Sequence, residues 1–147
     1  MHIESCSATW QFLFKISSVV MLACKVFIDT SSIIFGFENR ANVFGALSMQ
    51  LPACKPTISK GILKELNKIS FNKGRKGASA KASLREINAI KPEIDRNDSS
   101  GDEWLLGVAE NIKGAKIITN DSKLARSLKS LGASVLKLGK DGILRNL

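Results

Sequence analysis

Two aspartates follow short apolar runs that are typical of buried strands. Asp29 comes directly after residues 26–28, "VFI", and Asp121 comes directly after residues 116–120, "KIITN". Ligands of parallel α/β sheets bind just outside the carboxyl ends of the strands, so both carboxylates are candidates for a site. Each aspartate taken alone is explained as well by capping the helix that follows it.

Two further acids fall on the apolar faces of predicted helices. Glu65 stands at helical spacing from three apolar residues, Ile62, Leu66 and Ile69. Asp102 stands at the same spacing from Leu105, Leu106 and Ala109. Carboxylates rarely face a core without a partner, so each of the two predicts either a partly buried ion pair or a place in a functional site.

Together the four carboxylates predict a cation site. Two such charges 4 Å apart repel by about 4 kcal/mol at an effective dielectric constant of 20, and the sequence places no lysine at a matching buried position. A divalent cation would remove the repulsion, and ligands that are all oxygen favour Mg²⁺ or Mn²⁺ over zinc. The only histidine, His2, stands near the amino terminus, which excludes Ser-His-Asp, Cys-His and multi-histidine metal chemistry.

The elements that must position these acids alternate along the chain. Strands are predicted at residues 26–28, 57–59, 115–119 and 134–138. Helices are predicted from residue 31, within 38–48, and at 60–69, 78–90, 102–113 and 122–132, and residues 91–101 are expected to form a polar loop. Strands separated by helices pair in parallel through right-handed crossovers, so the expected fold class is α/β.

Size and charge limit the class of protein. The chain has 147 residues, of which 44% are hydrophobic, as expected for one globular domain. Its net charge of +9 favours contact with phosphates, either of nucleic acid or of an anionic membrane surface. A basic surface that is simply solvated is the alternative.

The cysteines and the amino-terminal segment give two further expectations. The spacing of Cys6, Cys24 and Cys54 fits neither a zinc site nor a disulfide framework, so we expect reduced thiols in a cytoplasmic protein. Lys15 interrupts the first apolar run, which is too short to cross a bilayer, and no membrane association is expected. Residues 1–20 are predicted to form an extension outside a domain at 21–147; an additional packed helix is the alternative.

Basic residues are concentrated between the second and third acids. Residues 60–91 contain only two acids, Glu65 and Glu86, and their candidate RNA-binding residues are Lys73, Arg75, Lys76, Lys81 and Arg85. Lys123, Arg126 and Lys129 form a second basic row after Asp121. Lysine and arginine contacts to phosphates give affinity without sequence selectivity. A solvated helix face is the alternative for the first group.

The motifs around the four acids, taken in order, resemble those of the PIN domain. They are "VFIDTSSI", "KGILKEL", "GDEWLLGVAE" and "KIITNDSKL", and the resemblance extends over residues 25–138. It implies a three-layer α/β/α sandwich around a central parallel sheet and a metal-dependent ribonuclease. By position, it assigns catalysis and the binding of Mg²⁺ or Mn²⁺ to the acidic quartet Asp29, Glu65, Asp102 and Asp121.

The resemblance also assigns supporting residues. Ser31 matches the small polar residue that often follows the first aspartate, and Asn120 is placed to orient Asp121 or a water. Many relatives carry an additional acid shortly after the position of Asp121, where Ser122 and Lys123 stand here. This departure removes one expected ligand of a second metal ion.

The function implied by the resemblance is that of an endoribonuclease with RNA as its partner. It is either the toxin of a VapC-type toxin–antitoxin pair, partnered by a small antitoxin, or a nuclease of ribosomal RNA processing, partnered by a ribosome-assembly protein. A homodimer is expected by the same resemblance. The alternative is a non-catalytic RNA-binding or scaffold module on the same fold.

Overall fold

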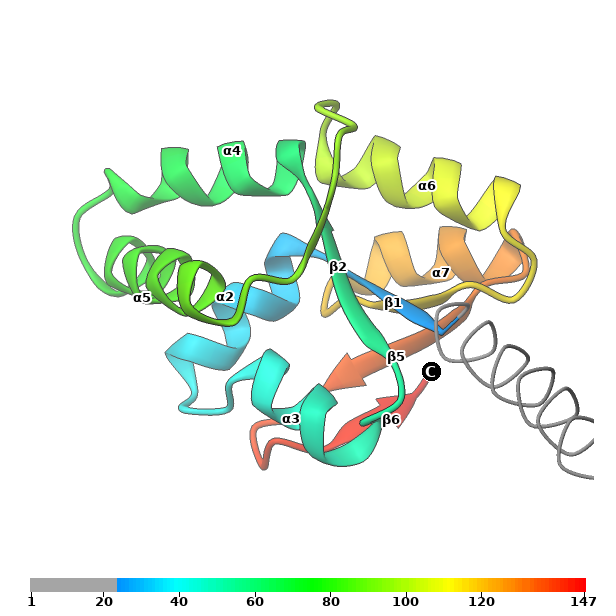
Figure 1. Ribbon diagram of the computed structural model, residues 1–147, viewed down its shortest axis with the longest axis horizontal. Helices are drawn as coiled ribbons and strands as arrows, with labels where there is room; N and C mark the ends of the chain where they lie inside the picture. Colours follow the sequence, from blue (N-terminus) through cyan, green and yellow to red (C-terminus); the bar gives the residue numbers. More distant parts are fainter. Residues whose placement is uncertain (1–23) are drawn as a thin grey trace, which may run out of the picture.

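The computed structural model describes residues 24–147, which form a six-stranded sheet flanked by helices (Figure 1). The strands are β1 (Lys25–Ile28), β2 (Lys55–Ser59), β3 (Glu93–Asp95), β4 (Lys116–Ile118), β5 (Ser134–Leu138) and β6 (Leu144–Asn146). Their order in the sheet is β3-β2-β1-β4-β5-β6, with all pairs parallel except β5 with β6. The expected α/β fold is confirmed.

Helices connect the strands and cover the sheet. They are α2 (Thr30–Glu38), α3 (Val43–Gln50), α4 (Lys60–Ser70), α5 (Arg75–Ile90), α6 (Gly101–Asn111) and α7 (Ser122–Ser130). Of the predicted domain at residues 21–147, the structure describes residues 24–147. The predicted extension at residues 1–20 lies outside the described residues. No helix within residues 24–147 is long and apolar enough to span a membrane.

The two central strands explain the apolar runs in the sequence. Val26 and Ile28 of β1 and Ile117 and Ile118 of β4 are completely buried. Strands covered on both faces are apolar at successive positions, without the alternation of a half-exposed strand. Asp29 and Thr119 directly follow these strands, so the sheet places them together at its carboxyl edge.

Two short edge strands are corrections to the predictions. β3 lies within residues 91–101, which were expected to be a loop, and β6 follows the strand expected to be the last. Each has three residues, and Ile94 of β3 is 39% exposed. Such strands are defined by backbone pairing to a neighbour and carry little apolar periodicity.

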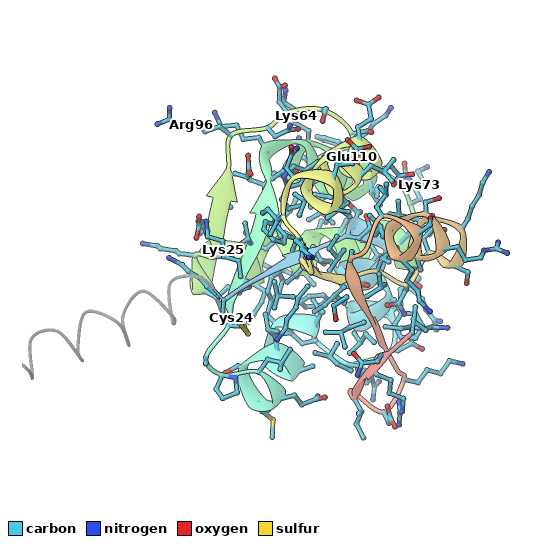
Figure 2. All side chains as sticks on the ribbon, turned by 90° about the vertical axis from the view of Figure 1, so that its right-hand side faces the viewer. Cys24, Lys25, Lys64, Lys73, Arg96 and Glu110 are labelled. Carbon is cyan, nitrogen blue, oxygen red and sulfur yellow. A yellow bond between two sulfur atoms is a disulfide. The ribbon has the colours of Figure 1, made fainter. Side chains whose placement is uncertain are left out.

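The cysteines are a second correction, because Cys24 and Cys54 form a disulfide (Figure 2). β1 and β2 are parallel neighbours with Lys25 opposite Lys55, so the residues just before them are adjacent, with Cα atoms 4.7 Å apart. The expectation of reduced thiols is therefore wrong for this pair, and it no longer supports a cytoplasmic location. Cys6 lies outside the described residues.

Candidate active site

The four acids all come from the carboxyl edge of the sheet. Asp29 follows β1 and Asp121 follows the end of β4, while Glu65 is on α4, which follows β2. Asp102 is the second residue of α6. The first turns of α4 and α6 face each other above this edge (Figure 1). Parallel strands with short connections to their helices bring the four positions into one region.

Asp29 is a buried carboxylate that does not cap its helix. It occupies the N-cap position of α2 and is 4% exposed, but its side chain makes no capping hydrogen bond. Its Oδ2 instead accepts hydrogen bonds from Ser31 Oγ at 2.6 Å and Thr119 Oγ1 at 2.8 Å. The capping alternative is thus wrong for Asp29, and Ser31 contacts the acid as the prediction placed it.

The ionisation of Asp29 reflects this environment. Burial raises the pKa of Asp29, the hydroxyls of Ser31 and Thr119 partly oppose the rise, and the charges of Asp102 and Glu65 add to it. Removal from water and the presence of other carboxylates both make the charged form of a carboxyl group less favourable. No cation within residues 24–147 forms an ion pair with Asp29 to offset that cost.

Asp121 does cap its helix. Its Oδ1 accepts hydrogen bonds from the amides of Lys123 at 3.0 Å and Leu124 at 3.1 Å, so the capping alternative holds for this residue. Its own amide donates to Thr119 Oγ1 at 3.1 Å. The hydroxyl of Thr119 therefore links the carboxylate of Asp29 to the backbone of Asp121.

Glu65 ties three helices together at the site. Its Oε2 accepts a hydrogen bond from Thr30 Oγ1 at 2.6 Å, and its Oε1 accepts one from the amide of Gly101 at 2.7 Å. A Cβ at position 101 would lie 2.6 Å from Ile62 Cδ1 and 3.2 Å from Glu65 Oε2. The missing side chain of Gly101 thus lets the start of α6, and with it Asp102, approach α4.

Asp102 is exposed at the start of α6 and is influenced by two other acids. Partial loss of hydration raises the pKa of Asp102, and the charges of Asp121 and Glu65 raise it further. Because Asp102 and Glu65 also act on Asp29, the four carboxylates share one electrostatic environment. That these acids form one metal site stays a prediction.

The arrangement lacks a preformed metal cage. Within residues 24–147, no three acidic, histidine or cysteine side chains are grouped closely enough to hold a metal ion. The ion pairs of this part of the chain lie elsewhere, at Glu93, Asp98 and Asp141. In the described part of the chain, the four acids are thus neither gathered around one point nor paired with lysine or arginine.

Asn120 joins two elements of the fold through its side-chain amide. Its Oδ1 accepts hydrogen bonds from Ser32 Oγ at 2.8 Å and from the amide of Leu138 at 3.1 Å, and its Nδ2 donates to the carbonyl of Leu138 at 2.9 Å. The amide group therefore joins α2 to the end of β5. Asn120 makes no hydrogen bond to the carboxylate of Asp121 within residues 24–147, while its predicted role of orienting a water stays a prediction.

The predicted RNA-binding residues lie on the α4–α5 hairpin. Lys73 is in the connection, Arg75 and Lys76 begin α5, and Lys81 and Arg85 follow along that helix. All five are exposed, and none forms an ion pair within the described part of the chain. The tip of this hairpin points away from the carboxyl edge of the sheet (Figure 1).

Comparison with known proteins identifies the family. A family model described as a PIN like domain matches residues 26–140. The chain belongs to the PIN-like domain family. Among solved structures, this PIN-like domain is similar to the PIN domain endonuclease Utp24, with a TM-score of 0.68 and 21% identity over 83% of this chain and 90% of that one.

A second solved structure shows the same fold. It is a domain of a functionally unknown protein from Methanocaldococcus jannaschii DSM 2661, with a TM-score of 0.57 and 15% identity. The match covers 80% of this chain and 92% of that one. No curated protein matches the sequence. At these identities the structural similarity establishes the fold of the PIN-like domain and leaves its activity to be argued from the site.

Proposed function

We propose that this PIN-like domain is a metal-dependent endoribonuclease that hydrolyses RNA phosphodiester bonds. The observation that carries the proposal is Asp29, a buried carboxylate at a strand end that has no cationic partner within residues 24–147 and whose pKa is raised by Asp102 and Glu65. A buried charge without a partner is rare outside functional sites. The fold shared with a PIN domain endonuclease supports the same activity.

The donor set suits a hard divalent cation. Asp29 Oδ1, Asp121 Oδ2 and both oxygens of Asp102 make no hydrogen bond within residues 24–147. Carboxylate oxygens are the ligands that Mg²⁺ and Mn²⁺ prefer, so these three aspartates would hold the ion. When bound, such an ion would lower the pKa of a water molecule that it coordinates and would stabilise negative charge on phosphate oxygens.

The remaining residues of the site would position the ligands. Ser31 and Thr119 fix the carboxyl plane of Asp29 through Oδ2, which leaves Oδ1 available. Glu65 uses both oxygens to hold Thr30 and Gly101, and so sets the place of Asp102. In this arrangement Glu65 contributes negative charge and position, while the aspartates contribute the free oxygens.

The basic surface supports RNA as the substrate. The five exposed cations of the α4–α5 hairpin have no acidic partner among the described residues, and Glu65 on α4 connects this hairpin to the site. Phosphate contacts of this kind bind a nucleic-acid strand without regard to its sequence. They would lead the strand toward the acids.

The test is Mn²⁺-dependent cleavage of a labelled single-stranded RNA. The wild-type protein should cleave it, and Asp29→Asn, Asp102→Asn and Asp121→Asn should each lose most of the activity while keeping the fold. Glu110→Gln is the matched control for Asp102→Asn, because Glu110 is an exposed acid at the other end of α6 (Figure 2). RNA binding without any cleavage would favour the non-catalytic module instead.

A further inference from the structure

A basic hollow lies next to Asp121, because the residues on either side of that aspartate line it. It has a volume of about 440 Å³ and lies between α7 and the ends of the chain's last strands. Its polar lining consists of Asn120, Ser122, Arg126, Lys129 and Lys137. No acidic side chain lines the hollow, and none of its three cations forms an ion pair within residues 24–147.

The helix α7 aligns this hollow with the site. Ser122, Arg126 and Lys129 are spaced i, i+4 and i+7, so they share one face of α7, while Leu124 and Leu128 are buried against the core. Ser122 directly follows Asp121, and Lys129 lies about 10 Å beyond Ser122 along the helix. The row of hydroxyl and cationic groups therefore starts at the acids and leads away from them.

Asp121 marks the boundary between the two regions. On one side it acts on the ionisation of Asp102 at the start of α6. On the other side its neighbours Asn120 and Ser122 line the hollow. Figure 1 shows α5 at the left, beside α2, and α7 at the right, above β1, so the hairpin and the helix that lines the hollow lie apart in this view.

We propose that this hollow binds the backbone phosphates of a single-stranded RNA next to the bond held at the acids. Arg126, Lys129 and Lys137 would contact phosphate oxygens, and Ser122 Oγ would donate to one of them. Arginine and lysine contacts to phosphate depend on charge and do not select a base. The inference rests on the proposed function for the identity of the strand, and it concerns binding alone.

The experiment measures binding of a fluorescent single-stranded RNA to the protein in EDTA, as a function of salt. The double variant Arg126→Gln/Lys129→Gln should bind on the order of tenfold more weakly near 0.1 M salt, with a log–log salt slope smaller in magnitude by about 1.4. Adding Lys137→Gln should reduce affinity and slope again. The charge-preserving double variant Arg126→Lys/Lys129→Arg should bind like the wild type.

The matched control is Lys113→Gln/Lys116→Gln. These lysines line another hollow, beside Cys24 and Phe27 at the amino edge of the sheet, and their loss changes the net charge by the same amount. The control should bind RNA like the wild type. Equal losses in the two double variants, no loss in either, or no binding by the wild type would overturn the proposal.

A further probe distinguishes nucleic acid from an acidic protein. Binding of poly-glutamate with the affinity and salt slope of the RNA would show a surface for acidic protein segments and would also overturn the proposal. Because every measurement is made without metal, failure of the nuclease proposal appears separately. In that case RNA would bind at α7 and remain uncleaved when Mn²⁺ is added.

Discussion

The hydroxyl of Thr119 donates a hydrogen bond of 2.8 Å to Asp29 Oδ2, across 90 positions of the sequence. The hydroxyl oxygen of Thr119 also accepts a hydrogen bond of 3.1 Å from the backbone amide of Asp121. Thr119 is completely buried at the carboxyl end of β4. One side chain therefore contacts two of the proposed metal ligands and also lowers the pKa of the more buried one, against the larger upward effect of burial.

Replacing this hydroxyl should change the pH dependence of cleavage. The bond from Thr119 lowers the pKa of Asp29, so Thr119→Val should raise that pKa and move the acid limb of the activity profile to higher pH. The shift is upward because the lost hydrogen bond stabilises the charged form of the carboxylate. The measurement is a pH–rate profile with Mn²⁺, and Thr119→Ser should keep the wild-type profile. An unchanged acid limb in the valine variant would contradict this role.

The buried charge of Asp29 should reduce the stability of the metal-free protein. Its pKa is raised in the folded state, so the folded state binds the proton more tightly and the free energy of unfolding falls as pH rises from 3.8 through the raised pKa. Asp29→Asn removes this term and should increase the melting temperature at neutral pH. Thermal unfolding in EDTA at several pH values checks both effects. A variant less stable than wild type at every pH would contradict the explanation.

The close approach of α6 to α4 should depend on Gly101. In Gly101→Ala, the new Cβ would lie 2.6 Å from Ile62 Cδ1, and we expect destabilisation of about 1–3 kcal/mol from the displacement. Because the displaced element carries Asp102, cleavage should fall as well. Gly107→Ala is the matched control on α6, since its added Cβ would meet no described atom within 4 Å apart from its chain neighbours and its own helix backbone. It should be neutral or stabilising by up to about 1 kcal/mol. Similar denaturation midpoints for the two variants would show that the contact is unimportant.

The disulfide should stabilise the start of the sheet. It joins residues 30 positions apart, and closing a loop of that length stabilises a fold by about 3–4 kcal/mol in the chain-entropy model. Reduction, or Cys54→Ser, should therefore lower the denaturation midpoint clearly. Thiol labelling of the unfolded, unreduced wild type should modify Cys6 and leave Cys24 and Cys54 unlabelled. Labelling of all three cysteines would contradict the pairing.

The four acids could be chosen as candidates from sequence because their signals are local, and their role in a metal site stays a prediction. An apolar run that ends at Asp29 or Asp121 indicates a strand end, and helical spacing places Glu65 on an apolar face. Their supporting residues could not be found in this way. Thr119 is defined by a contact across the sheet, and Gly101 by the space between two helices.

The errors have the same origin. The disulfide depends on the register of β1 against β2. The side-chain amide of Asn120 is hydrogen-bonded to the backbone of Leu138 because β5 ends beside it. The two missed edge strands are likewise defined by their neighbours in the sheet. Helices α4 and α7 have strong apolar periodicity in their own sequence, so their ends could be predicted closely without information about neighbouring elements.

The most direct test of the account is a crystal of the protein soaked in Mn²⁺ and measured for anomalous scattering. A manganese peak bounded by the carboxylates of Asp29, Asp102 and Asp121 is the predicted result, with the peak absent from Asp29→Asn crystals soaked in the same way. Crystals that contain no manganese at these aspartates, or that hold it only elsewhere on the surface, would contradict the claim that the acids form a metal site.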